Sequence, residues 1–271
     1  MSEKNIRERE RSEAAKKAAI RKKKRRRRRR LTALFVFLLA SAVTLYILSL
    51  TVFFKIDGIT VENNVLYSEG EIISASQVKP GDNLFALNSS KIEDRITKTL
   101  PFVQEVKLKK QLPSKLSLII AETKEEVCYY KDGVYYAGDK KGKILKEYSE
   151  KPAELIVIKT SNDIELQVGE YITFTKGEEK DLIDKHFQLS ENYGYTLNMI
   201  DVSDMYNSKI RIDNRFIAEF GSYSNIEPKA AHLNAMLKQM EAKKTGIIDL
   251  KVWTPEKAEA FFSERSIEGI E

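Results

Sequence analysis

The sequence predicts an α+β protein that is anchored by one membrane-spanning helix and carries two folded domains after it. Residues 31–54 form a run of 24 positions without a charged residue, proline or glycine. Ten consecutive basic residues, 21–30, precede this run. The part that follows, residues 55–271, combines the apolar periodicities of strands and of helices, and it is long enough for two modest hydrophobic cores.

The apolar run 31–54 is long enough to cross a bilayer. As a helix it would span about 36 Å, and the hydrocarbon core of a bilayer is about 30 Å thick. A cleavable signal peptide is the alternative, because Ala40-Ser41-Ala42 resembles a cleavage site. The apolar run continues to Phe54, however, and the 30 residues before it are long for the basic region of a signal peptide. We therefore expect an uncut transmembrane helix over residues 31–54.

Charge predicts the orientation of this helix. Residues 1–30 carry 16 Lys or Arg against 4 Asp or Glu, a net charge of +12, whereas the whole chain carries +6. The remainder is therefore acidic, at −6. A dense basic flank stays in the cytoplasm, so we expect a single-pass protein of the cell membrane with its C-terminal domains outside. We expect the basic tail, residues 1–30, to be disordered, although residues 1–20 are rich in Lys, Arg, Glu and Ala and could be helical when bound.

The basic run has two possible partners. It could bind nucleic acid, but it has no interleaved aromatic residues and no folded reader beside it. We favour an orientation signal that also contacts anionic lipid headgroups. The contacting residues include Arg21, Lys22, Arg25 and Arg30.

The first outer domain is expected over residues 55–123, with the element order strand, helix, helix, strand, strand. Ser68 and Glu71 have the spacing of a helix-capping box. Residues 92, 96 and 100 are apolar and share one face of a second helix, which Pro101 ends. Two strands with alternating apolar residues follow, and two helices on one face of a three-stranded sheet would bury both patterns.

The second outer domain is expected over residues 124–253 and is β-rich. Residues 129–136 predict a hairpin with a type I′ turn at Asp132-Gly133, although their tyrosines could also form a binding surface. One helix is predicted over 178–192 and another from Pro228, with Gly246 after its end. The last strand is predicted at residues 247–253, and residues 254–271 are expected to form a flexible acidic tail.

No catalytic set is apparent, so we expect no enzyme activity, metal or cofactor. His186 and His232 lie on predicted helices without a metal-ligand neighbour, and the single cysteine, Cys128, fits a small buried residue. Four carboxylates lie at predicted strand ends, where turn-forming aspartate is common; a paired-carboxylate hydrolase of cell-wall material is the weaker interpretation. These carboxylates are Asp201, Asp204, Asp213 and Asp249.

Several segments together carry a resemblance to a known family. In the first domain these are residues 54–61 (FKIDGITV), 81–85 (GDNLF) and 100–122. In the second they are residues 129–145, 198–221 and 246–253. Their order, after a basic-flanked apolar run, resembles the FtsQ/DivIB cell-division proteins, whose first outer domain is a POTRA domain. Asn63-Asn64 departs from the usual Gly-Asn of that family.

The resemblance implies a non-enzymatic division scaffold, enriched at the septum, that binds FtsL and DivIC/FtsB-type proteins. The last strand is the candidate contact, through backbone pairing and the only tryptophan. A POTRA-containing export or assembly module is the alternative, although the chain shows neither repeated POTRA units nor a series of barrel strands. The candidate residues in the last strand are Ile247, Ile248, Asp249, Leu250, Lys251, Val252 and Trp253; a possible docking edge in the POTRA domain comprises Leu116, Leu118 and Ile120.

Overall fold

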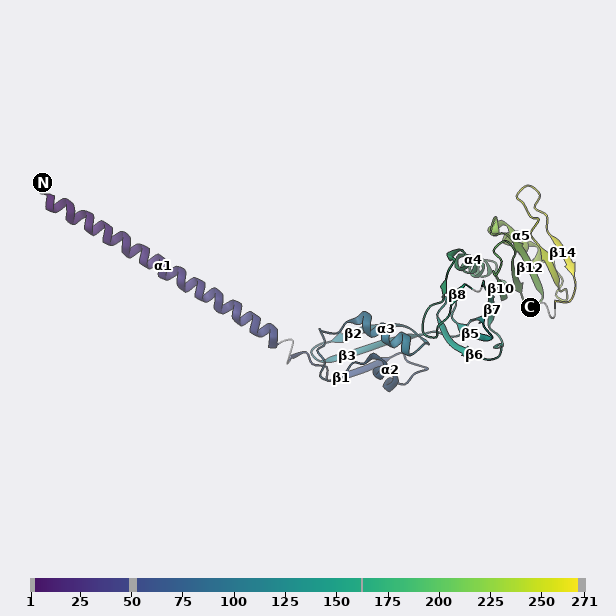
Figure 1. Ribbon diagram of the computed structural model, residues 1–271, viewed down its shortest axis with the longest axis horizontal. Helices are drawn as coiled ribbons and strands as arrows, with labels where there is room; N and C mark the ends of the chain where they lie inside the picture. The colour runs from purple at the N-terminus through teal and green to yellow at the C-terminus, as the bar shows by residue number, and fades with distance from the viewer. Residues whose placement is uncertain (1–2, 49–52, 162, 268–271) are drawn as a thin grey trace. The chain divides into compact units, whose positions relative to one another are not determined.

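The computed structural model describes residues 3–48, 53–161 and 163–267 (Figure 1). By its internal contacts the chain divides into two compact units, and each is described by itself. The first comprises residues 1–60, 79–88 and 109–117, and the second comprises 61–78, 89–108 and 118–271.

The chain begins with a long helix, α1 (Glu3–Leu48). Its stretch Arg27–Leu48 is the one described helix that is long and apolar enough to cross a membrane. The predicted span, 31–54, agrees with this stretch up to Leu48, and residues 49–52 lie outside the described part of the chain. The expectation of a disordered tail over 1–30 is wrong for this structure, since α1 begins at Glu3. The tail is rich in Ala, Glu, Lys and Arg, which are strong helix formers.

The next elements have the predicted order β-α-α-β-β. Ser68 and Glu71 form the predicted capping box, with Ser68 N donating to Glu71 Oε2 at 2.8 Å and Glu71 N donating to Ser68 Oγ at 3.3 Å. The second helix ends two residues before Pro101, as expected. The elements are β1 (Gly58–Glu62), α2 (Glu69–Ser76), α3 (Ser89–Thr99), β2 (Val103–Gln111) and β3 (Lys115–Glu122).

The predicted docking edge in this sheet is wrong. The strand order is β1-β3-β2, so β3 lies in the centre of the sheet and has a neighbour on each side. Its residues Leu116, Leu118 and Ile120 are buried. The sequence pattern showed an apolar strand but not its position in the sheet, which depends on non-local pairing.

The second domain is built on a nine-stranded mixed sheet with the order β14-β13-β12-β11-β10-β7-β4-β5-β6. The predicted hairpin is confirmed, with Tyr129 opposite Tyr136, and Asp132 and Gly133 have the positive φ angles of a type I′ turn. A small sheet pairs β8 with β9. The strands are β4 (Val127–Lys131), β5 (Val134–Gly138), β6 (Ile144–Tyr148), β7 (Ile156–Lys159), β8 (Ile164–Glu165), β9 (Thr173–Phe174), β10 (Leu197–Asp201), β11 (Ser208–Ile212), β12 (Phe216–Gly221), β13 (Gly246–Asp249) and β14 (Phe261–Glu264).

Two helices, α4 (Gly177–Tyr193) and α5 (Ile226–Gln239), bury their apolar faces with one face of this sheet in the main core. The apolar residues on one face of α4, together with His186, are fully or nearly buried. The predicted start of α5 at Pro228 is wrong by two residues; Pro228 lies in the first turn, where a missing N–H costs no intrahelical bond. Gly246 is not a helix stop but the first residue of β13.

A buried polar cluster within the second unit was not visible in the sequence. Lys143 is 1 % exposed, and its Nζ donates to the carbonyl oxygens of Thr97, at 2.9 Å, and Val103. Burial lowers the pKa of Lys143 to about 8. The Asp139 carboxylate accepts Gln104 Nε2 at 3.1 Å and Lys143 N at 2.9 Å. These bonds fix the turn between β5 and β6 against the ends of α3 and β2.

Candidate partner-binding surface

The C-terminal end of the nine-stranded sheet contains the predicted contact residues, but its strands differ from the prediction. The strand starting near Ile247 ends at Asp249, not at Trp253. Asp249 Oδ1 accepts the backbone N–H of Lys251 at 2.8 Å, and this Asx-type turn ends the strand. The turn-forming aspartate was a local signal for the break.

β13 is not the last strand, because β14 pairs with it antiparallel. The expectation that no structured element follows residue 253 is therefore wrong. Phe261 and Phe262 were the available signal, since aromatic residues favour strands. The Phe262 ring lies 6.2 Å from the ring of Phe216 in an edge-to-face contact.

The seven predicted contact residues fall into a buried and an accessible group. Ile248 and Leu250 belong to the main core, and Ile247 packs with Ile217 and Ile267 in a small cluster. Trp253 is 8 % exposed, so it is largely unavailable to a partner in this conformation. The accessible residues are Asp249, Lys251 and Val252.

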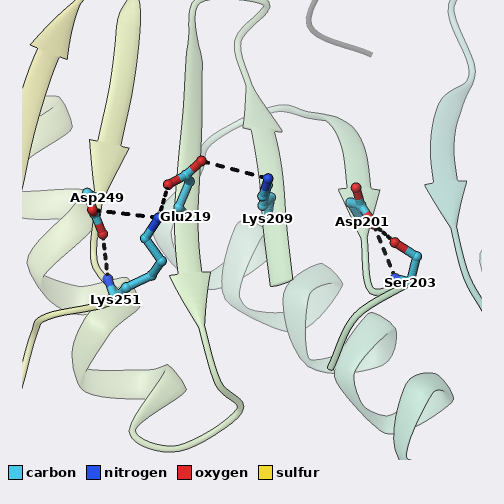
Figure 2. Close-up of polar contacts among 6 residues, drawn as sticks. All are labelled: Asp201, Ser203, Lys209, Glu219, Asp249 and Lys251. Atoms are coloured by element: carbon cyan, nitrogen blue, oxygen red, sulfur yellow. Dashed lines mark hydrogen bonds and ion pairs between the residues drawn. The ribbon is translucent and has the colours of Figure 1, made fainter. Parts of the chain in front are cut away.

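A chain of charges links the strands at this end of the sheet, as Figure 2 shows. Glu219, on β12, lies between Lys209 of β11 and Lys251; the distance from Glu219 Oε1 to Lys209 Nζ is 3.8 Å, and Oε2 accepts Lys251 Nζ. Lys251 Nζ also lies 3.7 Å from Asp249 Oδ2. The hydrogen bond to Glu219 raises the pKa of Lys251. Asp249 and Lys251 were among the residues predicted from the sequence, whereas Lys209 and Glu219 were not.

Strand register places these charges in one row. Asp201 of β10 is opposite Lys209, Lys209 is opposite Glu219, and Glu219 is opposite Asp249. The row ends at Phe261 of β14, which is 59 % exposed. Since directly opposite residues share a face of the sheet, this face carries a row of three acidic residues and one lysine that ends at an apolar residue on the last strand.

The outer side of β14 presents backbone hydrogen-bonding groups. Arg265 N donates to Thr245 O at 3.2 Å. Hydrogen-bonded pairs alternate in an antiparallel ladder, so the N–H of Ser263 also faces β13. The N–H and C=O groups of Phe262 and Glu264 then face away from β13. β14 is at the end of the strand order, so among the described strands none pairs with this side.

The four candidate carboxylates all have local structural roles. Asp201 Oδ1 accepts Ser203 N at 3.1 Å and Ser203 Oγ at 2.6 Å, as seen in Figure 2. Asp204 Oδ1 accepts Tyr206 N at 2.9 Å, and Asp213 Oδ1 accepts Thr196 N at 2.9 Å. With Asp249 at its own turn, the set fits turn-forming residues rather than paired acid–base groups.

The two histidines and the cysteine have structural surroundings rather than those of a reactive site. His186 is fully buried and stacks edge-on against Phe220, with ring centroids 5.0 Å apart, whereas His232 is partly exposed on α5. Cys128 is buried, as predicted, and burial raises the pKa of its thiol to about 11. Within residues 3–48, 53–161 and 163–267, no group of three His, Cys, Asp or Glu side chains is arranged to hold a metal ion.

An N-terminal apolar helix, a β-α-α-β-β unit and a β-rich sheet with an open edge define a POTRA-containing protein with the features of a single-pass membrane protein. Residues 54–123 match the sequence model of the POTRA domain, FtsQ-type. The chain is 30% identical to the cell division protein DivIB of Clostridium botulinum over 81% of this chain and 86% of that protein. It is also similar to DivIB of Clostridium acetobutylicum, at 28% identity over 73% of this chain and 80% of the relative, and to DivIB of Bacillus subtilis, at 24% over 74% and 73%. The chain belongs to the FtsQ/DivIB family of bacterial cell-division proteins.

Proposed function

We propose that this cell-division protein is a non-enzymatic scaffold that binds FtsL and DivIC/FtsB-type proteins by pairing a partner strand with the outer edge of β14. The observation that carries the proposal is the outward-facing backbone of Phe262 and Glu264 at the end of a nine-stranded sheet. A sheet edge of this kind accepts a strand through main-chain hydrogen bonds.

Residues beside this edge supply specificity. Phe261 offers an exposed apolar side chain, and the charged row from Asp201 to Asp249 lies on the same face of the sheet. A partner strand with an apolar residue opposite Phe261 and charges that complement the row would be selected over one without them. Lys251 and Val252 adjoin β13 and remain accessible, so they are secondary contact candidates.

Topology and domain organisation belong to the same proposal. In this proposal the basic flank keeps the N-terminus in the cytoplasm, and the two domains lie outside, where they meet other septal proteins. The POTRA domain then occupies residues 55–123, and the second domain extends beyond residue 253 to include β14, since β14 completes its sheet. The domain then continues past β14 to Ile267, which packs with Ile217 and Ile247.

Replacing Glu264 by Pro tests the edge directly. The variant loses one outward N–H donor but none of the bonds to β13, and edge strands tolerate proline in this orientation. We expect affinity for a DivIC–FtsL pair to fall about tenfold, the equivalent of one lost hydrogen bond. Titration of the full-length chain in detergent, by calorimetry or by interferometry, measures this change. Glu264→Ala is the matched control, because it removes the same side chain and keeps the N–H; equal affinities of the two variants would contradict edge pairing.

Gly246 provides a second test of the same surface. A Cβ added at this glycine would lie 2.2 Å from Ser263 O and 2.8 Å from Cε2 of Phe262, so Gly246→Ala should displace β14 from β13. We expect the variant to lose binding to the DivIC–FtsL pair, because the proposed edge is displaced with β14. Proteolysis between residues 254 and 265 should become faster in the same variant. Tighter binding in place of a loss would indicate that the partner strand replaces β14 on β13.

A further inference from the structure

The end of the first compact unit that follows the apolar helix contains three exposed apolar residues. Phe53 is 62 % exposed, Phe85 is 51 % exposed and Leu112 is 64 % exposed. They come from three separate segments: the start of the outer part, the turn after Gly81, and the tip of the β2–β3 hairpin. Exposed apolar side chains mark a contact surface where they gather at one end of a unit, whereas single scattered ones do not.

Hydrogen bonds hold the three segments together. Leu84 N donates to Phe54 O at 2.8 Å, which fixes the turn containing Phe85 beside the first segment. Asp57 N donates to Ser114 O at 2.9 Å, and Ser114 Oγ donates to the Asp57 carboxylate at 2.9 Å. These bonds fix the hairpin tip to the same segment.

Ring contacts orient the exposed side chains. The Phe85 ring packs edge-to-face on Phe54, with centroids 4.8 Å apart and an interplanar angle of 86°. Lys110 Nζ lies 5.7 Å from the centre of the Phe85 ring. The exposed aromatic side chain is therefore held in place and has a cation beside it.

Covalent connection brings this end of the unit to the membrane. Leu48 is the last residue of the apolar stretch that fits a membrane span, and Phe53 follows five positions later. Five residues extend at most about 18 Å, so Phe53 must lie near the outer interface of any bilayer that α1 crosses. Phe54 is its neighbour in the chain, and the contacts described above tie Phe85 and Leu112 to the same region.

Charge distinguishes this end from the rest of the outer part. Five lysines and two aspartates lie in residues 53–60, 79–88 and 109–117, a net charge of +3, whereas the chain after residue 30 carries −6 overall. Aromatic side chains prefer the headgroup level of a bilayer, and lysines are attracted to anionic lipid headgroups. The lysines are Lys55, Lys79, Lys109, Lys110 and Lys115.

We propose that Phe53, Phe85, Leu112 and the lysines around them form a membrane-contact surface that seats the POTRA domain on an anionic lipid bilayer. The proposal rests on the membrane span that is part of the proposed function. It assigns to this domain a lipid contact that is separate from the basic N-terminal tail and lies on the other side of the membrane.

The test uses the full-length chain in lipid nanodiscs that contain anionic lipid and lipids with a spin label at the headgroup. A fluorophore is attached to Gln111→Cys, which is exposed at the hairpin tip and leaves all three apolar residues intact. The native thiol of Cys128 is buried and does not compete for the label. We expect the spin-labelled lipid to quench this fluorophore about twofold or more, and the quenching to weaken in discs of zwitterionic lipid.

Side-chain variants separate a real contact from mere proximity. Leu112→Asp, and separately Phe85→Ser with Leu112→Ser, should abolish most of the quenching; the first variant keeps the Phe85–Phe54 contact and guards against a folding defect. Val65→Ser with Leu66→Ser is the matched control, because it removes two exposed apolar residues elsewhere, 85 % and 59 % exposed, and should leave the quenching unchanged. Absent quenching, or quenching unaffected by Leu112→Asp, would overturn the membrane contact while leaving the span intact. A chain that fails to enter the discs would overturn the span and the contact together.

Discussion

Acidification from pH 7 to pH 3 is expected to remove about 4–5 kcal/mol of unfolding free energy through His186 alone. His186 is fully buried on α4, and burial lowers its pKa from 6.5 to about 3. Its ring packs edge-on against Phe220 at 5.0 Å. Among the described residues neither ring nitrogen has a hydrogen-bond partner, so nothing compensates a positive charge there.

The direction of the effect follows from proton linkage. Below pH 6.5 the unfolded chain binds a proton at His186, whereas the folded chain does not until about pH 3. The stabilisation from a neutral His186 is therefore complete above pH 6.5 and is lost progressively as the pH falls from 6.5 to 3. Other acidic groups titrate in the same range, so the contribution of His186 must be measured as a difference.

His186→Leu isolates this contribution. Urea unfolding of the full-length chain in detergent, followed by the fluorescence of Trp253, gives the unfolding free energy of each protein. Relative to the unsubstituted chain, the variant should gain about 3 kcal/mol between pH 7 and pH 4. At pH 7 it should already be equal or slightly more stable, because two unpaired nitrogens are removed from the core. His232→Leu, at a partly exposed position, is the matched control, and a pH-independent difference for His186→Leu would contradict the buried neutral histidine.

Short sequence patterns predicted much of this fold, because turns and helix caps are determined by interactions between residues that are close in the sequence. The alternation around Asp132-Gly133 determined the β4–β5 register, and the spacing of Ser68 and Glu71 determined the start of α2. Errors arose where the outcome depends on pairing between distant segments. β3 was predicted to be an edge strand, and β14 was not predicted. The position of a strand in a sheet depends on pairing with distant segments, and the strand's own sequence does not specify these partners.

In the candidate site, too, neighbours in the sequence were predicted and contacts between distant segments were not. Asp249 and Lys251 were found because they belong to one short segment, whereas Glu219, which joins Lys251 to Lys209, comes from a strand about 30 residues earlier. Alternation along the chain places Ile248 and Leu250 on the core face of the sheet. It did not show that Ile217 and Ile267 would cover Ile247 on the opposite face.

Replacing Trp253 by Ala is expected to lower the unfolding free energy by about 3–5 kcal/mol, because the side chain is 8 % exposed and its removal leaves a large cavity. Trp253→Phe should cost clearly less, since it refills most of the space, and the indole N–H has no hydrogen-bond partner among the described residues to lose. Val252→Ala, at a neighbour that is 49 % exposed, should change stability by less than about 0.5 kcal/mol. Urea unfolding followed by circular dichroism measures all three variants without the tryptophan signal.

Comparing the stability and the binding affinity of Trp253→Ala decides whether the only tryptophan is a binding hot spot or a core residue. If it is a core residue, weaker binding by Trp253→Ala follows from the smaller folded fraction alone, and the affinity per folded molecule stays unchanged. A hot spot gives the opposite pattern, with lower affinity under conditions where the variant is fully folded and little loss of stability. Glu264→Pro should show that second pattern if β14 is the edge that partners use. The two variants therefore distinguish two contact sites. Weaker binding by folded Glu264→Pro indicates β14, whereas weaker binding by folded Trp253→Ala indicates the segment that ends at Trp253.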